Sequence, residues 1–194
     1  MSERQLGNVI DFNDIVTRQT NLIPEGTIVK VKMSIRHGGY GQDGMLTKSR
    51  KTGTLYCDAM LIVREGVFVM RKIFERLGVQ DPDPYNKWVQ KSLHRLRSIL
   101  ESTHNIMPTD TSEHAKEKRR IKSYAEFNGL EFLIKVGIEK PQNPQYKTEN
   151  CVLGIVTPDW KEYAEYSAPI DPPPEKRFQG NPYKTFDEKV SGPF

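Results

Sequence analysis

Hydrophobic and polar residues alternate in two segments in the first third of the chain. In residues 27–36, TIVKVKMSIR, the odd positions from Val29 onward are apolar and the even positions are polar or basic. Residues 54–64, TLYCDAMLIVR, repeat the pattern, with Leu55 and the following odd positions predicted inward and Tyr56 predicted outward. A period of two is typical of a strand with one buried face. The pattern therefore predicts two half-buried strands, and the first has a cationic outer face.

A third strand and two helices are predicted next. Residues 67–75, VFVMRKIFE, follow a predicted tight turn at Glu65-Gly66. Asp83-Pro84 is typical of a helix cap and first helical position, and apolar residues at helical spacing, Trp88 among them, predict a helix to about Thr103. Residues 110–127 read as a second, very polar helix. The first helix also carries a basic stripe at a spacing of four, made of Lys87, Lys91 and Arg95.

The order of elements predicts the fold class. Strand character returns in residues 130–140 and 147–158, on either side of the turn PQNPQ. Three strands, a helix and two strands is the order of the five-stranded OB barrel. We therefore expect a mainly β protein, a five-stranded OB-like barrel with a helical insertion between strands 3 and 4. Five-stranded α+β domains of other topology share this order and remain an alternative.

Composition separates this domain from two flanking segments. Residues 1–23 show no clear period and are predicted to be an N-terminal arm, and residues 24–168 form the OB-like domain. Residues 169–194 are rich in proline and poor in aliphatic side chains, which predicts a disordered tail that binds partners.

Hydropathy and cysteine content favour a cytoplasmic protein. Apolar residues make up 36% of the chain and charged residues 28%, with a mean hydropathy of −0.64. No stretch approaches the roughly 18 apolar residues of a membrane span, and the N-terminus lacks an apolar signal core. Cys57 and Cys151 are too few for a disulfide framework and are expected to be reduced. We expect a location in the cytoplasm of a bacterial host cell and no membrane partner.

The loop between the first two predicted strands, within SIRHGGYGQDGMLTKSRKTGTLY, is rich in glycine and cations. OB barrels bind oligonucleotides through this loop, through the loop between strands 4 and 5, and on the face of strands 2 and 3. Single-strand binders need cations for phosphates and aromatic rings for bases. The candidate cations are Lys30, Lys32, Arg36, Lys48, Arg50, Lys51, Arg71 and Lys72. The candidate stacking residues are Tyr40, Tyr56, Phe68 and Phe74, with Tyr40 and Tyr56 favoured.

Enzyme signatures are weak. The four histidines do not pair with either cysteine at metal-ligand spacing, and there is no P-loop, HExxH, GxSxG or dinucleotide fingerprint. Asp81 and Asp83 are accounted for by a turn and a helix cap. We therefore expect no catalytic site, no cofactor and no metal.

Two motifs in residues 22–158 resemble a known family. An IPxGT start and the motif EGxFxxRKIF are similar to the core of small phage and mobile-element proteins that are predicted OB-fold single-stranded-DNA-binding proteins. The second motif matches Glu65, Gly66, Phe68, Arg71, Lys72, Ile73 and Phe74. The resemblance implies a role in DNA replication or recombination.

The chain end resembles a second group. Bacterial single-stranded-DNA-binding proteins end in an acidic tail whose terminal Pro-Phe docks on replication and repair enzymes, and Pro193 and Phe194 match that tip. Lys189 departs from the acidic pattern. The resemblance implies that such enzymes are partners.

Three hypotheses about function follow. The leading one is a non-enzymatic protein that coats single-stranded DNA, with self-association left open. The second is a protein-interaction module whose basic loop is only solubilising. The third is a DNA-processing enzyme that uses acids such as Asp58.

Overall fold

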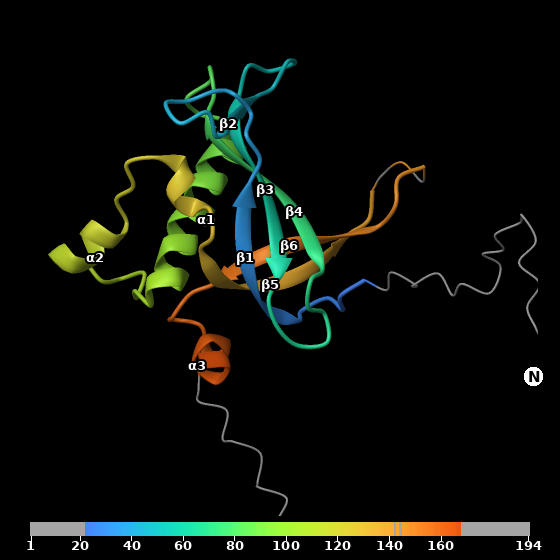
Figure 1. The fold of residues 1–194 in the computed structure, drawn as a ribbon, viewed down its shortest axis with the longest axis vertical. Helices are drawn as coiled ribbons and strands as arrows, with labels where there is room; N and C mark the ends of the chain where they lie inside the picture. The colour runs from blue at the N-terminus through green and yellow to red at the C-terminus, as the bar shows by residue number, and fades with distance from the viewer. Residues whose placement is uncertain (1–21, 142, 144, 168–194) are drawn as a thin grey trace, which may run out of the picture.

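A computed structural model describes residues 22–141, 143 and 145–167, and these residues form an antiparallel sheet with flanking helices (Figure 1). The predicted arm up to residue 21 and the tail from residue 168, with Pro193 and Phe194, lie outside the described residues. The elements are β1 Ile28–Ile35, β2 Leu46–Lys48, β3 Leu55–Val63, β4 Lys72–Gln80, α1 Lys87–His104, α2 Glu113–Lys118, the 3₁₀ helix η1 Tyr124–Phe127, β5 Glu131–Glu139, β6 Glu149–Val156 and α3 Lys161–Ser167.

The sheet is open and antiparallel. Its order is β2-β3-β1-β5-β6, and β4 pairs with the other edge of β3. Strands β1 and β2 pair one after the other with β3: β1 pairs with Ala59 to Val63, and the short strand β2 pairs with Leu55 to Cys57. Within the described residues no ladder joins β4 to β6, although the two strands lie near each other.

One side chain spans this gap between β4 and β6. Arg95 of α1 forms an ion pair with Glu75 of β4 and donates a hydrogen bond of 2.8 Å from Nη2 to the Val152 carbonyl of β6. Burial raises the pKa of Glu75, and the Arg95 guanidinium partly offsets the rise. Arg95, predicted as part of an outer basic stripe, is therefore an internal bridge.

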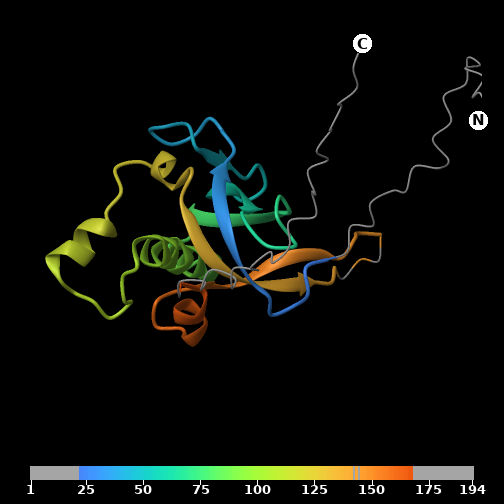
Figure 2. The same ribbon diagram turned by 60° about the horizontal axis from the view of Figure 1, so that its bottom comes forward.

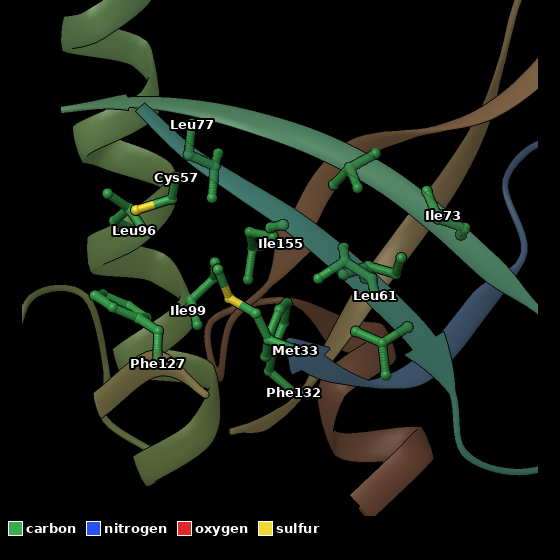
Figure 3. Close-up of a cluster of buried hydrophobic side chains, with 14 of the residues drawn as sticks. Met33, Cys57, Leu61, Ile73, Leu77, Leu96, Ile99, Phe127, Phe132 and Ile155 are labelled. Atoms are coloured by element: carbon green, nitrogen blue, oxygen red, sulfur yellow. The ribbon is translucent and has the colours of Figure 1, made fainter. Parts of the chain in front are cut away.

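The core lies between one face of the sheet and α1, as predicted from the alternation. Val29, Val31, Met33 and Ile35 of β1 are buried, and so are the odd positions of β3 from Cys57 to Val63. These residues belong to one buried cluster with Leu96 and Ile99 of α1 and Phe127 of η1, and Figure 3 shows Met33 and Cys57 on the side of the sheet that faces α1. Both cysteines are free thiols, and burial raises the pKa of Cys57 to about 12. The strand faces inferred for residues 27–36 and 54–64 are confirmed.

The third strand begins five residues later than predicted. Residues 67–70 form a turn, in which Met70 takes a φ of 67° and its N–H donates to the Val63 carbonyl at 2.9 Å. The apolar run at residues 67–70 was predicted to be part of the strand, but Val67 and Val69 are exposed in the turn, and burial of Ile73 and Leu77 fixes the register of β4.

The helix boundaries also differ from the prediction. Asp83 forms a turn by accepting from the Tyr85 N–H at 2.9 Å, and the cap of α1 is Asn86, whose Oδ1 accepts from the N–H groups of Trp88 and Val89. The predicted helix over 110–127 is instead the short α2, a loop and η1.

Two arginines that bind one buried carboxylate connect α1 to the segment that follows it. Glu101 is buried in α1 and accepts from Nε of Arg97 and of Arg119, each at 2.8 Å. Arg119 also donates to the carbonyls of Asp110 and Met107. These bonds fold the segment after α1 back on that helix, which stops a continuous second helix.

Helix α3, which the sequence pattern did not predict, lies at the end of the sheet opposite the loops between β1 and β3 (Figure 1, Figure 2). The Tyr163 hydroxyl donates to the Ser102 carbonyl at 2.9 Å, and the Tyr166 hydroxyl donates to Glu65 Oε1 at 2.6 Å. Two tyrosines therefore fasten α3 to the end of α1 and to the turn between β3 and β4.

Candidate nucleic-acid interface

The glycine-rich loop after β1 folds into a hairpin. Tyr40 and Leu46 exchange two backbone hydrogen bonds of 2.9 Å, and β2 follows directly. Gly38 lies against β2 so closely that a Cβ at this position would be 2.2 Å from Thr47 Oγ1. The loop is therefore held close to the sheet, and glycine at position 38 makes that approach possible.

Asp43 anchors the tip of this hairpin to η1. Its carboxylate accepts from the Ser123 hydroxyl at 2.5 Å, from the Met45 N–H at 3.0 Å and from the Ala125 N–H at 2.9 Å. These hydrogen bonds, that from Ser123 foremost, lower the pKa of Asp43 to about 2. The only acid in the cationic loop is thus used to fix the loop in place.

The second part of the loop, residues 48–54, carries three exposed cations, Lys48, Arg50 and Lys51. The Ser49 N–H donates to the Thr54 carbonyl at 2.9 Å, and the Thr54 hydroxyl donates to Asp81. Asp81 also accepts from the Asp83 N–H at 2.9 Å. The Asp81 carboxylate therefore ties the loop to the segment before α1. None of the three cations has a carboxylate partner within the described residues.

A hollow of about 590 Å³, open to solvent, lies between this loop, the sheet and the start of α1. Its described lining combines cations, hydroxyls and aromatic rings and contains no carboxylate. The lining residues are Thr47, Lys48, Ser49, Arg50, Lys51, Thr52, Thr54, Tyr56, Arg76 and Trp88. We refer to this set as the loop hollow.

Aromatic rings and cations lie next to each other around the loop hollow. The ring centroids of Tyr56 and Trp88 are 6.4 Å apart at an interplanar angle of 58°. Arg76 Cζ lies 5.9 Å from the centroid of Tyr56, and Lys48 Nζ lies 5.9 Å from that of Tyr40. Lys48 thus joins the loop hollow to Tyr40, which is 47% exposed. The arrangement can contact phosphates and the faces of planar rings at the same time.

The outer face of β3 and β4 extends this surface. Phe74, 55% exposed, pairs with Met60 across the two strands, and Lys72 pairs with Ile62. By alternation these residues share a face with Tyr56 and Arg76. Phe68, which was also predicted to be on this face, lies instead in the turn before β4 and packs against the core. Arg71, the residue before β4, is half-buried.

The cations of β1 lie apart from the loop hollow. Lys30 Nζ is 3.5 Å from Glu131 Oε2 and lines a different hollow, beneath α3. Lys32 is exposed. Arg36 Nη2 pairs with Asp58 Oδ2 at 2.5 Å. The structure therefore brings together Tyr40, Lys48, Arg50, Lys51 and Tyr56, but not the three cations predicted from the first strand.

Arg76 and Trp88 line the loop hollow but were not among the predicted site residues. Arg76 continues the outward positions of Lys72 and Phe74, so alternation alone would identify it once β4 has the correct bounds. Trp88 fits the apolar period of α1, which predicts burial, yet it is 41% exposed. Its place beside Tyr56 depends on how α1 packs against β4, which no local pattern encodes.

Comparison with models of known protein families and with curated proteins finds no match for this chain. In the described part of the chain, no group of three or more His, Cys, Asp or Glu side chains is placed to hold a metal ion. A search of the same residues finds no helix with the length and apolar character needed to cross a membrane.

Proposed function

We propose that this protein binds single-stranded nucleic acid, DNA in the first instance, through the loop hollow and the outer face of β3 and β4. The observation that carries the proposal is the described lining of the loop hollow, where Lys48, Arg50, Lys51 and Arg76 surround the rings of Tyr56 and Trp88 without a carboxylate. Cations neutralise phosphates and exposed rings stack on bases, and a single strand offers both groups at once.

The strand order supports an OB-like arrangement. With β2 set aside as a part of the loop, the sheet runs β4-β3-β1-β5-β6, and α1 lies between β4 and β5 in the sequence. An OB barrel has this order and binds ligands at its second and third strands and its first loop. In this arrangement β4 and β6 approach each other, and Arg95 takes the place of a closing ladder.

The family resemblance gives the proposal a biological setting. The IPxGT and EGxFxxRKIF motifs favour a protein of phages or mobile elements that coats single-stranded DNA during replication or recombination, in the cytoplasm of the bacterial host. The Pro193-Phe194 tip extends the proposal to docking of a replication or recombination enzyme. Deleting these two residues should leave DNA affinity nearly unchanged and abolish capture of that enzyme.

Fluorescence anisotropy with labelled oligo(dT) at several salt concentrations tests the proposal. The logarithm of the association constant should fall with the logarithm of salt concentration by about 0.7 per phosphate contacted. Replacing Lys48, Arg50 and Lys51 together by Ala should flatten this slope while the circular dichroism spectrum and thermal unfolding stay unchanged.

A matched variant controls for net charge. Lys116, Lys118 and Arg120 are exposed residues in and after α2, and their replacement by Ala removes the same charge elsewhere. The control should keep the wild-type slope. If both triple variants flatten the salt slope equally, or if the loop variant keeps the wild-type slope, the loop is not part of the binding site. Absence of oligo(dT) binding by the wild-type protein at low salt would favour the protein-interaction hypothesis.

A further inference from the structure

Trp88 has an unusual setting for a residue of an amphipathic helix. It lies at the second position of α1. Its backbone N–H donates to Asn86 Oδ1 at 3.0 Å, so the helix cap fixes the backbone that carries the ring. The indole nevertheless remains 41% exposed and lines the loop hollow. A large apolar ring on a capped helix end thus lies at the wall of a cationic hollow.

Gly78 of β4 makes this position of the ring possible. A Cβ at residue 78 would lie 2.9 Å from Cζ3 and 3.0 Å from Cε3 of Trp88. Only a residue without a side chain lets the indole lie against the strand at this point. Gly78 pairs with Tyr56 in the adjacent strand, which explains why the rings of Tyr56 and Trp88 meet.

The rings of Tyr56 and Trp88 differ in whether a cation lies over them. The guanidinium of Arg76 lies over Tyr56, at 5.9 Å from its centroid. Among the described residues no cation lies over the ring of Trp88, although Arg76 and the loop cations share the same hollow. The volume of about 590 Å³ falls within the range of about 300–1,000 Å³ that is typical of small-molecule pockets in proteins.

From this geometry we infer that the loop hollow is a pocket for one unpaired nucleobase, which stacks on Trp88 while Lys48, Arg50 and Lys51 contact the flanking phosphates. The inference rests on the proposed function and adds a means of selection. A base inside a duplex is already stacked and paired, so it cannot enter a hollow between a loop and a helix end. The protein therefore selects single strands by base insertion, whereas the loop cations attract any nucleic acid.

Tryptophan fluorescence can test this directly, because the chain has two tryptophans, Trp88 and Trp160. Trp160 packs over Gly154 of β6 and Lys135 of β5 and takes no part in lining the loop hollow. In the full-length W160F protein, oligo(dT) should quench Trp88 with the same midpoint as the anisotropy change. A duplex of equal length, or a strand of abasic deoxyribose phosphates, should bind at low salt without this quenching.

Substitutions give an independent readout. Trp88→Ala should weaken oligo(dT) binding about 5- to 150-fold, the loss that corresponds to one stacked base, and leave the salt slope unchanged because the phosphate contacts persist. Trp88→Phe should recover part of the affinity. Gly78→Ala should displace the indole and weaken binding similarly, whereas Gly154→Ala, which crowds Trp160 instead, should not.

The outcomes separate the two proposals. If wild-type protein binds oligo(dT) with the expected salt slope but Trp88 fluorescence in W160F does not change, the base pocket is refuted and the proposed function stands. Equal quenching by the duplex would also refute it. If the wild type does not bind oligo(dT), both fall. The fluorescence arm keeps the inference testable even if Trp88→Ala fails to fold.

Discussion

Replacing Arg95 by Met should destabilise the protein and make its stability depend on pH in a specific way. The Arg95 and Glu75 side chains retain only 20% and 16% of their exposure, and Arg95 also satisfies the Val152 carbonyl. Removing one member of a buried ion pair costs about 3–5 kcal/mol, because the partner charge is left without compensation. Since both groups keep some contact with water, we expect about 3 kcal/mol.

The pH dependence follows from the direction of the Glu75 pKa. Burial already raises this pKa, and loss of the Arg95 guanidinium should raise it further. A carboxyl whose pKa is raised in the folded state contributes stability below its unfolded pKa of about 4.5, and that contribution is lost as pH rises through the folded pKa. The loss of folding stability caused by Arg95→Met should therefore be largest at pH 7 and shrink toward pH 4.5.

Urea unfolding followed by circular dichroism measures this effect. With a slope of about 2 kcal/mol per molar urea, the midpoint at pH 7 should fall by about 1.5 M. The double variant Glu75→Gln with Arg95→Met should be more stable at pH 7 than Arg95→Met alone, because no charge is left buried. A midpoint shift below about 0.5 M, or a deficit that is the same at both pH values, would refute the bridge between β4 and β6.

Three further predictions concern the two faces of the sheet and the loop. Ile73→Ala should cost about 2–5 kcal/mol in urea unfolding, whereas Phe74→Ala, on the exposed face, should change stability by less than about 0.5 kcal/mol; the reverse order would show that the register of β4 is wrong. Asp43 should titrate near pH 2 in a carbon-13 NMR experiment, and its contribution to folding stability should be present above about pH 4 and lost as the pH falls through 2, a dependence that Asp43→Asn abolishes. Tyr40→Ala should weaken oligo(dT) binding by about 1–3 kcal/mol in anisotropy titrations with unchanged thermal unfolding, and a drop in melting temperature instead would place this ring in the fold and not in the interface.

The sequence by itself determined the elements whose side chains alternate or recur around one buried surface. The faces of β1 and β3 follow from a period of two, because a residue on the wrong face would expose the core or bury a lysine. The existence of α1 and of the β5–β6 hairpin follows from the same local signals. The loop between β1 and β3 was identified as the candidate interface from its glycines and cations together with its place in the predicted OB-like order of elements. The structure places Tyr40, Lys48, Arg50, Lys51 and Tyr56 together there.

Only the tertiary structure decided the features that depend on contacts between distant segments. The start of β4 is set by the pairing of Lys72 with Ile62, and α3 is fastened by the hydrogen bonds of Tyr163 and Tyr166, which leave no periodic signature. Lys30 and Arg95 look like solvent-facing cations in the sequence, yet each has an acidic partner from a different element of the fold. Trp88 looks like a core residue, yet it lines the loop hollow, where Gly78 leaves room for its ring. Periodicity reports which side of its own element a residue occupies, whereas the role of that side is set by the neighbouring element that packs against it.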